Sequence, residues 1–370
     1  MSRFFLFAND PGGANVVGIT AQGLRDAGHT VLLLGTDLAL KRYAEVGAEA
    51  HAYQQYFVFD QPETIQKFLA SWKPHVVVTG TSAQGNAERE IWRIAGCMDV
   101  PSAAILDQWM NVSQRFIPPG SMSEAPKHSP ASIPNRILTM DDEARRIMIA
   151  GGIPEARICV SGHPYLEYIA ARHGGRGDRD RKGTPGNLLT VLFASEPVSL
   201  DYGGPEAAIA YWGFNEYTSF DAVVQALRGW QARTGRSIRL IAKLHPRDET
   251  GKYQVWNDQS AMDFEIIEMR DLDQSMVGET ADLILGLSSM FLLESVVMGI
   301  PTASLMVGLK RDNPFILDHL NILSSLRSPE ALASFLDAVA AGTYRCPEWR
   351  IADGAIRKTV HILEGLACPN

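Results

Sequence analysis

The feature that most constrains the fold is an alternation of short apolar runs with helical patterns, which occurs twice along the chain. In the first half the apolar runs are FFLFAN, TVLLLG, HVVVTG and SAAILD, followed by RILTM and RICVSG. Strands that are apolar on both faces and separated by helices indicate a parallel sheet covered on both sides. The alternation restarts with LLTVLFAS and continues through SIRLIAKL, DFEIIEM, ADLILGL and PTASLM. The sequence therefore predicts two doubly wound α/β domains.

A glycine-rich, charged segment, HGGRGDRDRKGTPGN, separates the two halves. Such a composition buries too little apolar surface to join either core, so it predicts a linker. We expect a Rossmann-like acceptor domain at 1–172, the linker at 173–187, a Rossmann-like nucleotide-sugar domain at 188–348 and a C-terminal helix at 349–370. Ligands of doubly wound sheets bind at the carboxyl ends of the strands, which predicts a central cleft faced by both domains.

Composition excludes several classes of function. A net charge of -8 argues against a nucleic-acid partner, because phosphate backbones select basic surfaces. The four cysteines are scattered and form no CxxC pair, so neither a disulfide framework nor a zinc site is expected, which fits the cytoplasm. No apolar run is long enough to span a bilayer, and MSRFFLFANDPGG is typical of a first strand rather than a signal peptide. Peripheral attachment to the inner face of the membrane stays open.

In the second half a strand ends on the motif KLHPRD. Pro246 restricts the residue before it to extended geometry, which holds His245 at the rim of the sheet. An imidazole held there can donate a hydrogen bond to a phosphate oxygen, and Arg247 adds positive charge. The simpler interpretation is a strand that stops in a solvated turn.

A second strand of that half ends in GLSS, directly before the helical segment MFLLESVVMG. Hydroxyls and unpaired amides at a helix N-terminus bind anions, so Gly286, Ser288 and Ser289 are candidates to hold a phosphate. One serine would suffice as an ordinary N-cap. Glu294 lies within two turns of the helix start, where its carboxylate could accept hydrogen bonds from ribose hydroxyls.

In the first half the loop FANDPGGAN joins the first strand to the first helix. Glycines at 12 and 13 would let the backbone approach a ligand, and Asp10 and Asn15 are candidates to bind a donor or acceptor sugar. The loop is not a GxGxxG fingerprint, and a tight turn with a solvated Asp10 explains it equally well.

The segment AAILDQWMN ends another strand of the first half on Asp107. A carboxylate at the carboxyl end of a buried strand is a candidate general base, because partial burial raises its pKa. Trp109 could stack on a sugar and Asn111 could bind its hydroxyls. The alternatives are an aspartate that caps the next turn and a tryptophan that packs.

Taken together, the glycine-rich loop, SGHPYLE, KLHPRD and GLSSMFLLESVVMGIPTASL resemble the GT-B glycosyltransferase superfamily. The HP motif followed by the Ser-Ser motif resembles bacterial sialyltransferases and CDP-glycerol glycerophosphotransferases. That resemblance implies that His245, Ser288 and Ser289 bind the phosphate of a cytidine nucleotide. It also implies a nucleotide contact from an acidic residue after the next strand, for which Asp271 and Asp273 are the candidates.

One departure from that pattern concerns the base. Sialyltransferases carry an acidic-acidic-glycine motif at the end of a first-domain strand, where this chain has LDQWMN. Asp107 could serve as the base, but the second acid and the glycine are absent. The segment LESVVMGIPTASL also resembles uridine-nucleotide GT-B enzymes, in which the glutamate corresponding to Glu294 holds the ribose.

The resemblance implies an inverting, metal-independent glycosyltransferase of polysaccharide biosynthesis, with Asp107 as base and His245 at the leaving phosphate. The donor would be a CMP-sugar rather than a UDP-sugar, carrying for example a nonulosonic acid. The acceptor would be a glycan or a lipid-linked hydroxyl, and no cofactor other than the co-substrate is expected. The alternatives are a UDP-N-acetylhexosamine 2-epimerase or nucleotide-sugar hydrolase, a CDP-glycerol-type transferase, and a non-catalytic sugar-binding protein.

Overall fold

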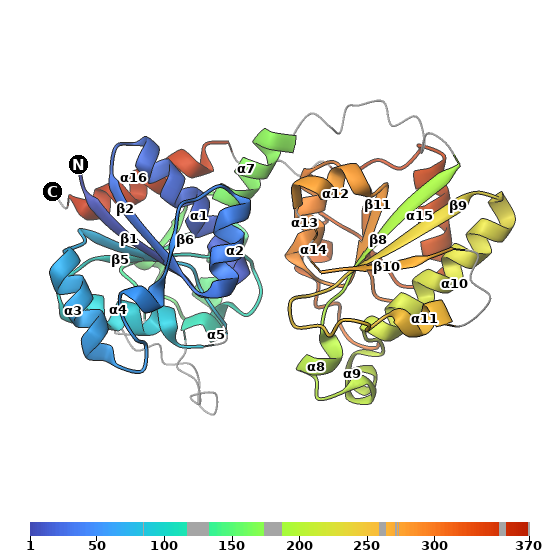
Figure 1. The fold of residues 1–370 in the computed structure, drawn as a ribbon, viewed down its shortest axis with the longest axis horizontal. Helices are drawn as coiled ribbons and strands as arrows, with labels where there is room; N and C mark the ends of the chain where they lie inside the picture. The colour runs from blue at the N-terminus through green and yellow to red at the C-terminus, as the bar shows by residue number, and fades with distance from the viewer. Residues whose placement is uncertain are drawn as a thin grey trace. The chain divides into compact units, whose positions relative to one another are not determined.

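The computed structural model describes residues 1–83, 85–116, 133–173, 187–258, 264–270, 272, 274–347 and 353–368. The chain divides into two compact units (Figure 1). Unit 1 comprises Met1–Tyr168 and Ile351–Asn370, and unit 2 comprises Ile169–Arg350. Each unit contains one parallel sheet with helices on its faces, which confirms the predicted fold class of two doubly wound domains. In the described part of the chain, no helix is long and apolar enough to cross a membrane.

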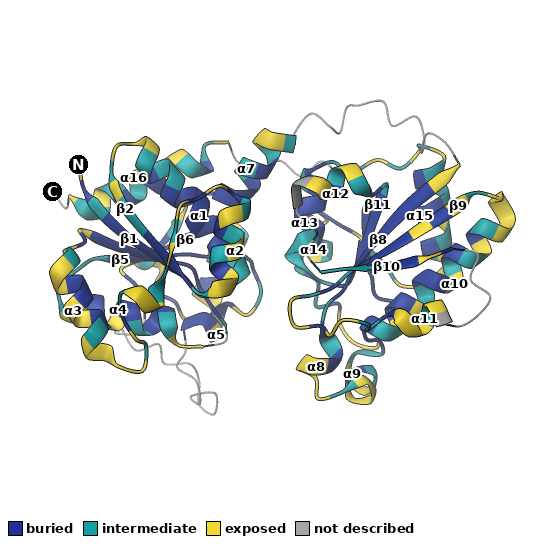
Figure 2. Cartoon of the chain, viewed as in Figure 1, coloured by how far each residue is buried: buried dark blue, intermediate teal, exposed yellow. Residues whose placement is uncertain are grey.

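Sheet A of unit 1 has seven strands in the order β3-β2-β1-β4-β5-β6-β7. The strands are β1 (Arg3–Ala8), β2 (Thr30–Gly35), β3 (His51–Ala52), β4 (Val76–Thr79), β5 (Ser102–Ile105), β6 (Arg136–Thr139) and β7 (Ile158–Val160). Phe5 on the central strand β1 is aligned with Leu32 of β2 and Val77 of β4. Residues 4–8 of β1 are fully buried because helices cover both faces of the sheet (Figure 2).

The helices of unit 1 begin and end at ordinary sequence signals. They are α1 (Pro11–Asp26), α2 (Asp37–Glu45), α3 (Pro62–Trp72), α4 (Ala87–Cys97), α5 (Val112–Phe116), α6 (Asp142–Ala150) and α16 (Ala355–Ala367), while α7 (Pro164–His173) leads into unit 2. Helix α1 begins where Asp10 accepts a hydrogen bond from the Gly13 amide and Pro11 occupies the first turn. The C-terminal helix α16 lies along α1 (Figure 1).

Sheet B of unit 2 has six strands in the order β10-β9-β8-β11-β12-β13. The strands are β8 (Leu188–Ala194), β9 (Ser237–Lys243), β10 (Ile266–Met269), β11 (Leu283–Gly286), β12 (Thr302–Leu305) and β13 (Ser325–Leu326). Val191 on the central strand β8 is aligned with Leu240 of β9 and Leu283 of β11. All three of these side chains are fully buried in the core of unit 2.

The helices of unit 2 vary widely in length. They are α8 (Val198–Asp201), α9 (Pro205–Trp212), α10 (Glu216–Thr234), α11 (Gln254–Asp258), α12 (Gln274–Thr280), α13 (Met290–Val297), α14 (Ile316–His319) and α15 (Pro329–Ala340). Helix α10 begins at a capping box formed by Asn215 and Thr218 and ends at Gly235, which has a left-handed backbone.

The strand order locates the expected ligand position in each sheet. In each sheet the strands that follow the first one along the chain are added first on one side of it and then on the other. The change of side falls between β1 and β4 in sheet A and between β8 and β11 in sheet B. In open parallel sheets, ligands bind outside the carboxyl ends of the strands at this switch point. The residues that follow these four strands are therefore the first candidates for a functional site.

Candidate functional site

At the switch point of sheet A, the backbone after β1 approaches the backbone after β4. A Cβ atom on Gly80 would lie 2.8 Å from the Cα atom of Gly13, so neither position has room for a side chain. Asp10 Oδ1 accepts a hydrogen bond from the Gly13 amide at 2.8 Å and thereby fixes the start of α1. The predicted loop residues Asp10, Gly12 and Gly13 thus lie at the expected ligand position of unit 1.

Asp107, which follows β5, belongs to the same group of residues. Its Oδ1 atom is 2.8 Å from Nη1 of the buried Arg115, which also donates to the hydroxyl of Thr81 at 2.8 Å. Its Oδ2 atom faces Gly12, where any Cβ atom would collide with it. Asp107 is 7% exposed. The predicted base therefore lies beside the glycine-rich loop, with one carboxylate oxygen committed to a guanidinium.

Glu88, in the first turn of α4, is a site residue that the sequence analysis missed. Its carboxylate accepts hydrogen bonds from the Ser82 hydroxyl at 2.7 Å and the Asn9 amide at 3.2 Å. Burial and then repulsion from Asp10 raise its pKa to about 7. Burial and then repulsion from Asp107 raise the pKa of the partly exposed Asp10 to about 6. Unit 1 therefore holds two carboxyl groups that exchange protons near neutral pH.

The other polar candidates of unit 1 have protein partners or face outward. Asn15 Oδ1 accepts a hydrogen bond from Arg42 Nε at 3.0 Å. Trp109 is buried, and its indole nitrogen donates to both carboxylate oxygens of Asp141 at 3.0 Å, as expected of a packed side chain. Asn111 is exposed, with a left-handed backbone at φ 56°.

His245 lies at the rim of sheet B, directly after β9 and Leu244. Its Nδ1 atom accepts the Arg247 amide at 3.1 Å, which places the ring proton of the neutral form on Nε2. Burial and then the charge of Arg247 lower the pKa of His245 to about 4. The guanidinium of Arg247 pairs with both carboxylate oxygens of Asp201, at 2.6 and 3.0 Å. At neutral pH, His245 can therefore donate a hydrogen bond but carries no charge.

At the switch point of sheet B, Ser288 is bound to Glu196, a residue that the sequence analysis did not select. Glu196 follows β8, and its Oε2 atom accepts the Ser288 amide at 2.7 Å and the Ser288 hydroxyl at 3.2 Å. The next residue, Ser289, caps α13 by accepting the Phe291 amide at 3.2 Å. The signal for Glu196 was the same as for Asp107, since both are carboxylates at the end of a buried strand.

Two further predicted residues, Gly286 and Glu294, lie in β11 and α13, the elements that Ser288 and Ser289 connect. Gly286 ends β11, and a Cβ atom there would lie 2.9 Å from a methyl carbon of Leu292, so its side packs against α13. Glu294 lies in α13 and is 8% exposed. Asp271 and Asp273, the predicted nucleotide contacts after β10, lie outside the described residues.

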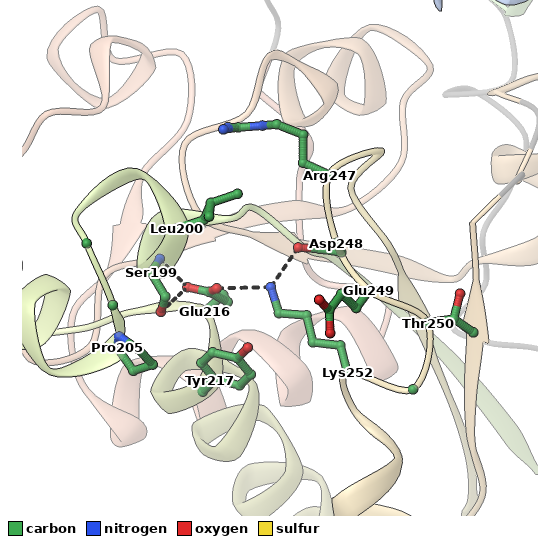
Figure 3. A pocket seen from close by; sticks show the side chains of 13 residues that line it. Ser199, Leu200, Pro205, Glu216, Tyr217, Arg247, Asp248, Glu249, Thr250 and Lys252 are labelled. Carbon is green, nitrogen blue, oxygen red and sulfur yellow. Dashed lines mark hydrogen bonds and ion pairs between the residues drawn. The ribbon is translucent and has the colours of Figure 1, made fainter.

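Unit 2 also contains a pocket of about 580 Å³, lined by the loops that follow β8 and β9 and by the start of α10. Figure 3 shows Lys252 between Glu216 and Asp248, with Ser199 beside Glu216. The ammonium lies 2.9 Å from Glu216 Oε1 and 2.7 Å from Asp248 Oδ1, and all three side chains are almost fully buried. Glu216 Oε2 accepts the Ser199 amide and hydroxyl at 2.9 Å. This network fixes the pocket wall and leaves no surplus positive charge in it.

Among the described residues, no group of three or more His, Cys, Asp or Glu side chains could hold a metal ion. In unit 1 the carboxyl groups of Asp10 and Glu88 can exchange protons near neutral pH. In unit 2 His245 and Ser288 can donate hydrogen bonds, and burial raises the pKa of Glu196 to about 7.

Solved structures share this fold over nearly the whole chain. The UDP-GlcNAc 2-epimerase of Methanocaldococcus jannaschii superposes with a TM-score of 0.66 at 14% identity, covering 98% of this chain and 99% of that one. The UDP-GlcNAc 2-epimerase of Neisseria meningitidis bound to UDP-GlcNAc gives 0.62 at 11%, covering 98% and 100%. MurG of Acinetobacter baumannii gives 0.52 at 10%, covering 98% and 99%. These similarities confirm the GT-B type of fold predicted from the sequence.

Comparison by sequence adds no assignment. No protein-family model matches the chain. No curated protein has a sequence significantly similar to this chain. The structural neighbours lend no support to the more specific resemblance to sialyltransferases or CDP-glycerol transferases, which stays a prediction.

Proposed function

We propose that this chain is a nucleotide-sugar enzyme that acts on a UDP-activated N-acetylhexosamine and inverts the sugar at C2. The observation that carries the proposal is the pair Asp10 and Glu88 at the switch point of sheet A, with pKa values raised to about 6 and about 7. Inversion at a carbon that bears hydrogen requires one proton to leave and another to arrive at the opposite face. Because C2 is not adjacent to a carbonyl group of the ring, the electron pair of the broken C2–H bond would form a C1–C2 double bond and expel UDP from C1, and UDP would add back to C1 as C2 takes up the new proton. Groups that exchange protons near neutral pH are suited to both steps.

In unit 1, different residues would transfer the protons and position the groups that transfer them. Asp10 is partly exposed at the ligand position, so it is our candidate to exchange a proton with the sugar. Glu88 is buried and would act as a positioning residue, because it accepts hydrogen bonds from the Asn9 amide and from the Ser82 hydroxyl beside Asp10. Asp107 presents its second oxygen beside Gly12 and is the candidate for the other face.

The residues of unit 2 would bind the nucleotide. The Nε2–H of His245 and the amide and hydroxyl of Ser288 are donors at the carboxyl ends of β9 and β11, where a diphosphate would accept hydrogen bonds. Structural similarity to UDP-GlcNAc 2-epimerases, one of them solved with UDP-GlcNAc and UDP, supports uridine over cytidine. We propose a cytoplasmic location for this enzyme. Peripheral attachment to the inner face of the membrane is a second, independent proposal.

The transferase predicted from the sequence is the alternative, with a CMP-sugar as donor and Asp107 as base. It requires Asp107 to take a proton from an acceptor hydroxyl while one of its oxygens is paired with Arg115. A hydrolase of the same fold is the other alternative. The epimerase exchanges the hydrogen at C2 of the sugar with solvent, whereas neither alternative requires that exchange.

Proton NMR in D₂O tests the proposal. With UDP-GlcNAc as sole substrate, we expect a second C2 epimer to appear and deuterium to accumulate at C2. A transferase without acceptor leaves C2 unlabelled, and a hydrolase releases UDP and free sugar. Asp10→Asn should reduce the exchange by about 10²- to 10⁴-fold, the usual contribution of one acid or base, while UDP still binds.

Asp26→Asn is the matched control, because Asp26 is an exposed aspartate at the end of the same helix. Its exchange rate should equal that of the unaltered protein. Calorimetric titration with UDP and CMP completes the test. Tighter binding of CMP together with an absence of C2 exchange would overturn the epimerase proposal and favour the transferase.

A further inference from the structure

The contact between Glu196 and Ser288 spans the position where sheet B is expected to bind its ligand. Strands β8 and β11 are parallel neighbours on either side of the switch point. Glu196 is the second residue after β8, and Ser288 is the second residue after β11. The amide and the hydroxyl of Ser288 both donate to the Glu196 carboxylate. A protein carboxylate thus occupies the donors that lie nearest to the expected ligand.

The surroundings of Glu196 are unfavourable for a permanent negative charge. The charged groups that act on it most strongly are Asp201, at the end of α8, and Glu216, at the start of α10, and both repel it. The cations Arg247 and Lys252 are paired with these same two acids. A third cation, Lys243 at the end of β9, has its ammonium 4.9 Å from the ring centroid of Phe291 in the first turn of α13. The pKa of Glu196 is raised to about 7, mainly by burial and then by the repulsion from Asp201 and Glu216. The hydrogen bonds from Ser288 lower it, but by less.

We propose that Glu196 holds the phosphate-binding donors of Ser288 in the free protein, and that a ligand phosphate takes those donors only when Glu196 is protonated. This inference rests on the proposed nucleotide-sugar function and adds a specificity-determining residue to it. A phosphate and an ionised carboxylate at hydrogen-bond distance from the same two donors would repel each other. Binding of the nucleotide sugar therefore takes up one proton at Glu196, and the fraction of protein with a neutral Glu196 limits the apparent affinity.

Calorimetric titration with UDP-GlcNAc between pH 6 and pH 8 tests this inference. The pyrophosphate of that ligand is a diester, so it does not itself titrate in this range. Because Glu196 is about nine-tenths protonated at pH 6 and one-tenth at pH 8 for a pKa of about 7, the affinity should fall about tenfold. Titration at pH 8 in two buffers with different ionisation enthalpies should detect uptake of close to one proton. Phosphate buffer is avoided because it would compete.

Glu196→Gln separates this role from a structural one. Glutamine can still accept the hydrogen bonds from Ser288 but carries no charge, so its affinity should be independent of pH and about tenfold higher than that of the unaltered protein at pH 8. Glu206→Gln is the matched control, since Glu206 is an exposed glutamate of the same unit. The series is repeated with Asp10→Asn and with Glu88→Gln, because Asp10 and Glu88 also titrate in this range. His245, with a pKa of about 4, does not.

The outcomes distinguish the inference from the function on which it rests. Binding that is independent of pH, with no proton uptake and equal affinity for Glu196→Gln, would overturn the role of Glu196 and leave the nucleotide-sugar function standing. Absence of binding by UDP-GlcNAc and UDP to both proteins over the whole range would overturn both. If Glu196→Gln unfolds, as judged by its thermal transition, proton uptake that persists in both Asp10→Asn and Glu88→Gln supports the role of Glu196, and its loss in either variant overturns that role.

Discussion

At the scale of single residues, Gly12 is the position where the smallest change should have a large effect. A Cβ atom there collides with Oδ2 of Asp107, and Asp107 cannot turn away without breaking its ion pair with Arg115. We expect Gly12→Ala to destabilise the protein by roughly 1 to 3 kcal/mol, as overpacking does, and to reduce activity. Gly96→Ala is the control, because Gly96 lies in α4 with open space around it, and alanine should stabilise that helix by about 0.5 to 1 kcal/mol. Urea unfolding measures both, and equal stability of the two variants would contradict the predicted collision.

The same scale shows which site residues a sequence can reveal. Asp10 and Asp107 were selected because each follows an apolar run, and the structure brings both to the rim of sheet A. Glu88 was missed, although it falls on the buried face of α4 with Ile91 and Trp92, where an acid is unexpected. The partner of a buried acid is not visible in sequence, since Glu196 and Ser288 are 92 positions apart along the chain.

At the scale of elements, the strands were predictable where both faces are buried. The runs that became β1, β4, β8 and β11 are apolar over nearly their whole length, as expected of strands in the middle of a parallel sheet. The edge strands β3 and β13 have two residues each, too few to show a pattern. The sequence predicted helix α16 from its amphipathic pattern, but it did not predict the surface on which α16 packs. That surface is α1, where Gly23 has no room for a Cβ atom because of Ile356 and Val360.

Helix α16 therefore carries a prediction of its own. Leu363 is fully buried in unit 1, so Leu363→Ala should destabilise that unit by about 2 to 5 kcal/mol, the usual cost of such a cavity. Gly365→Ala in the same helix is the control, since a Cβ atom there meets nothing within 4 Å. Hydrogen exchange measured by mass spectrometry should detect faster exchange in the strands of sheet A and unchanged exchange in sheet B. Equal acceleration in both sheets would contradict the assignment of α16 to unit 1 alone.

At the scale of the whole molecule, buried acids and buried histidines have opposite effects on how the free energy of unfolding changes with pH. Carboxyl groups with raised pKa values, such as Glu88, bind more protons in the folded state, so their contribution to stability falls as pH rises from about 4.5 to about 7. His163 and His245 have lowered pKa values, so the unfolded state binds more protons and stability rises with pH up to about 6.5. Above about pH 7.5 the histidines are neutral in both states, and between pH 6.5 and pH 7.5 they offset only part of the decline caused by Glu88 and Glu196, whose pKa values are both raised to about 7.

The free energy of unfolding should therefore decline between pH 6.5 and pH 8. Glu88 still holds its proton in the folded state at the lower pH and has lost it at the higher one, which corresponds to about 1 kcal/mol for a pKa of about 7. Glu88→Gln keeps an oxygen that can accept from Ser82 and Asn9, so it should remove this part of the decline and be more stable than the unaltered protein at pH 8. Urea unfolding at the two pH values measures the difference, with the exposed Glu63→Gln as control. If the free energy of unfolding changes by the same amount from pH 6.5 to pH 8 in Glu88→Gln as in the unaltered protein, Glu88 is already ionised at pH 6.5. The proton exchange proposed for unit 1 would then lose its physical basis.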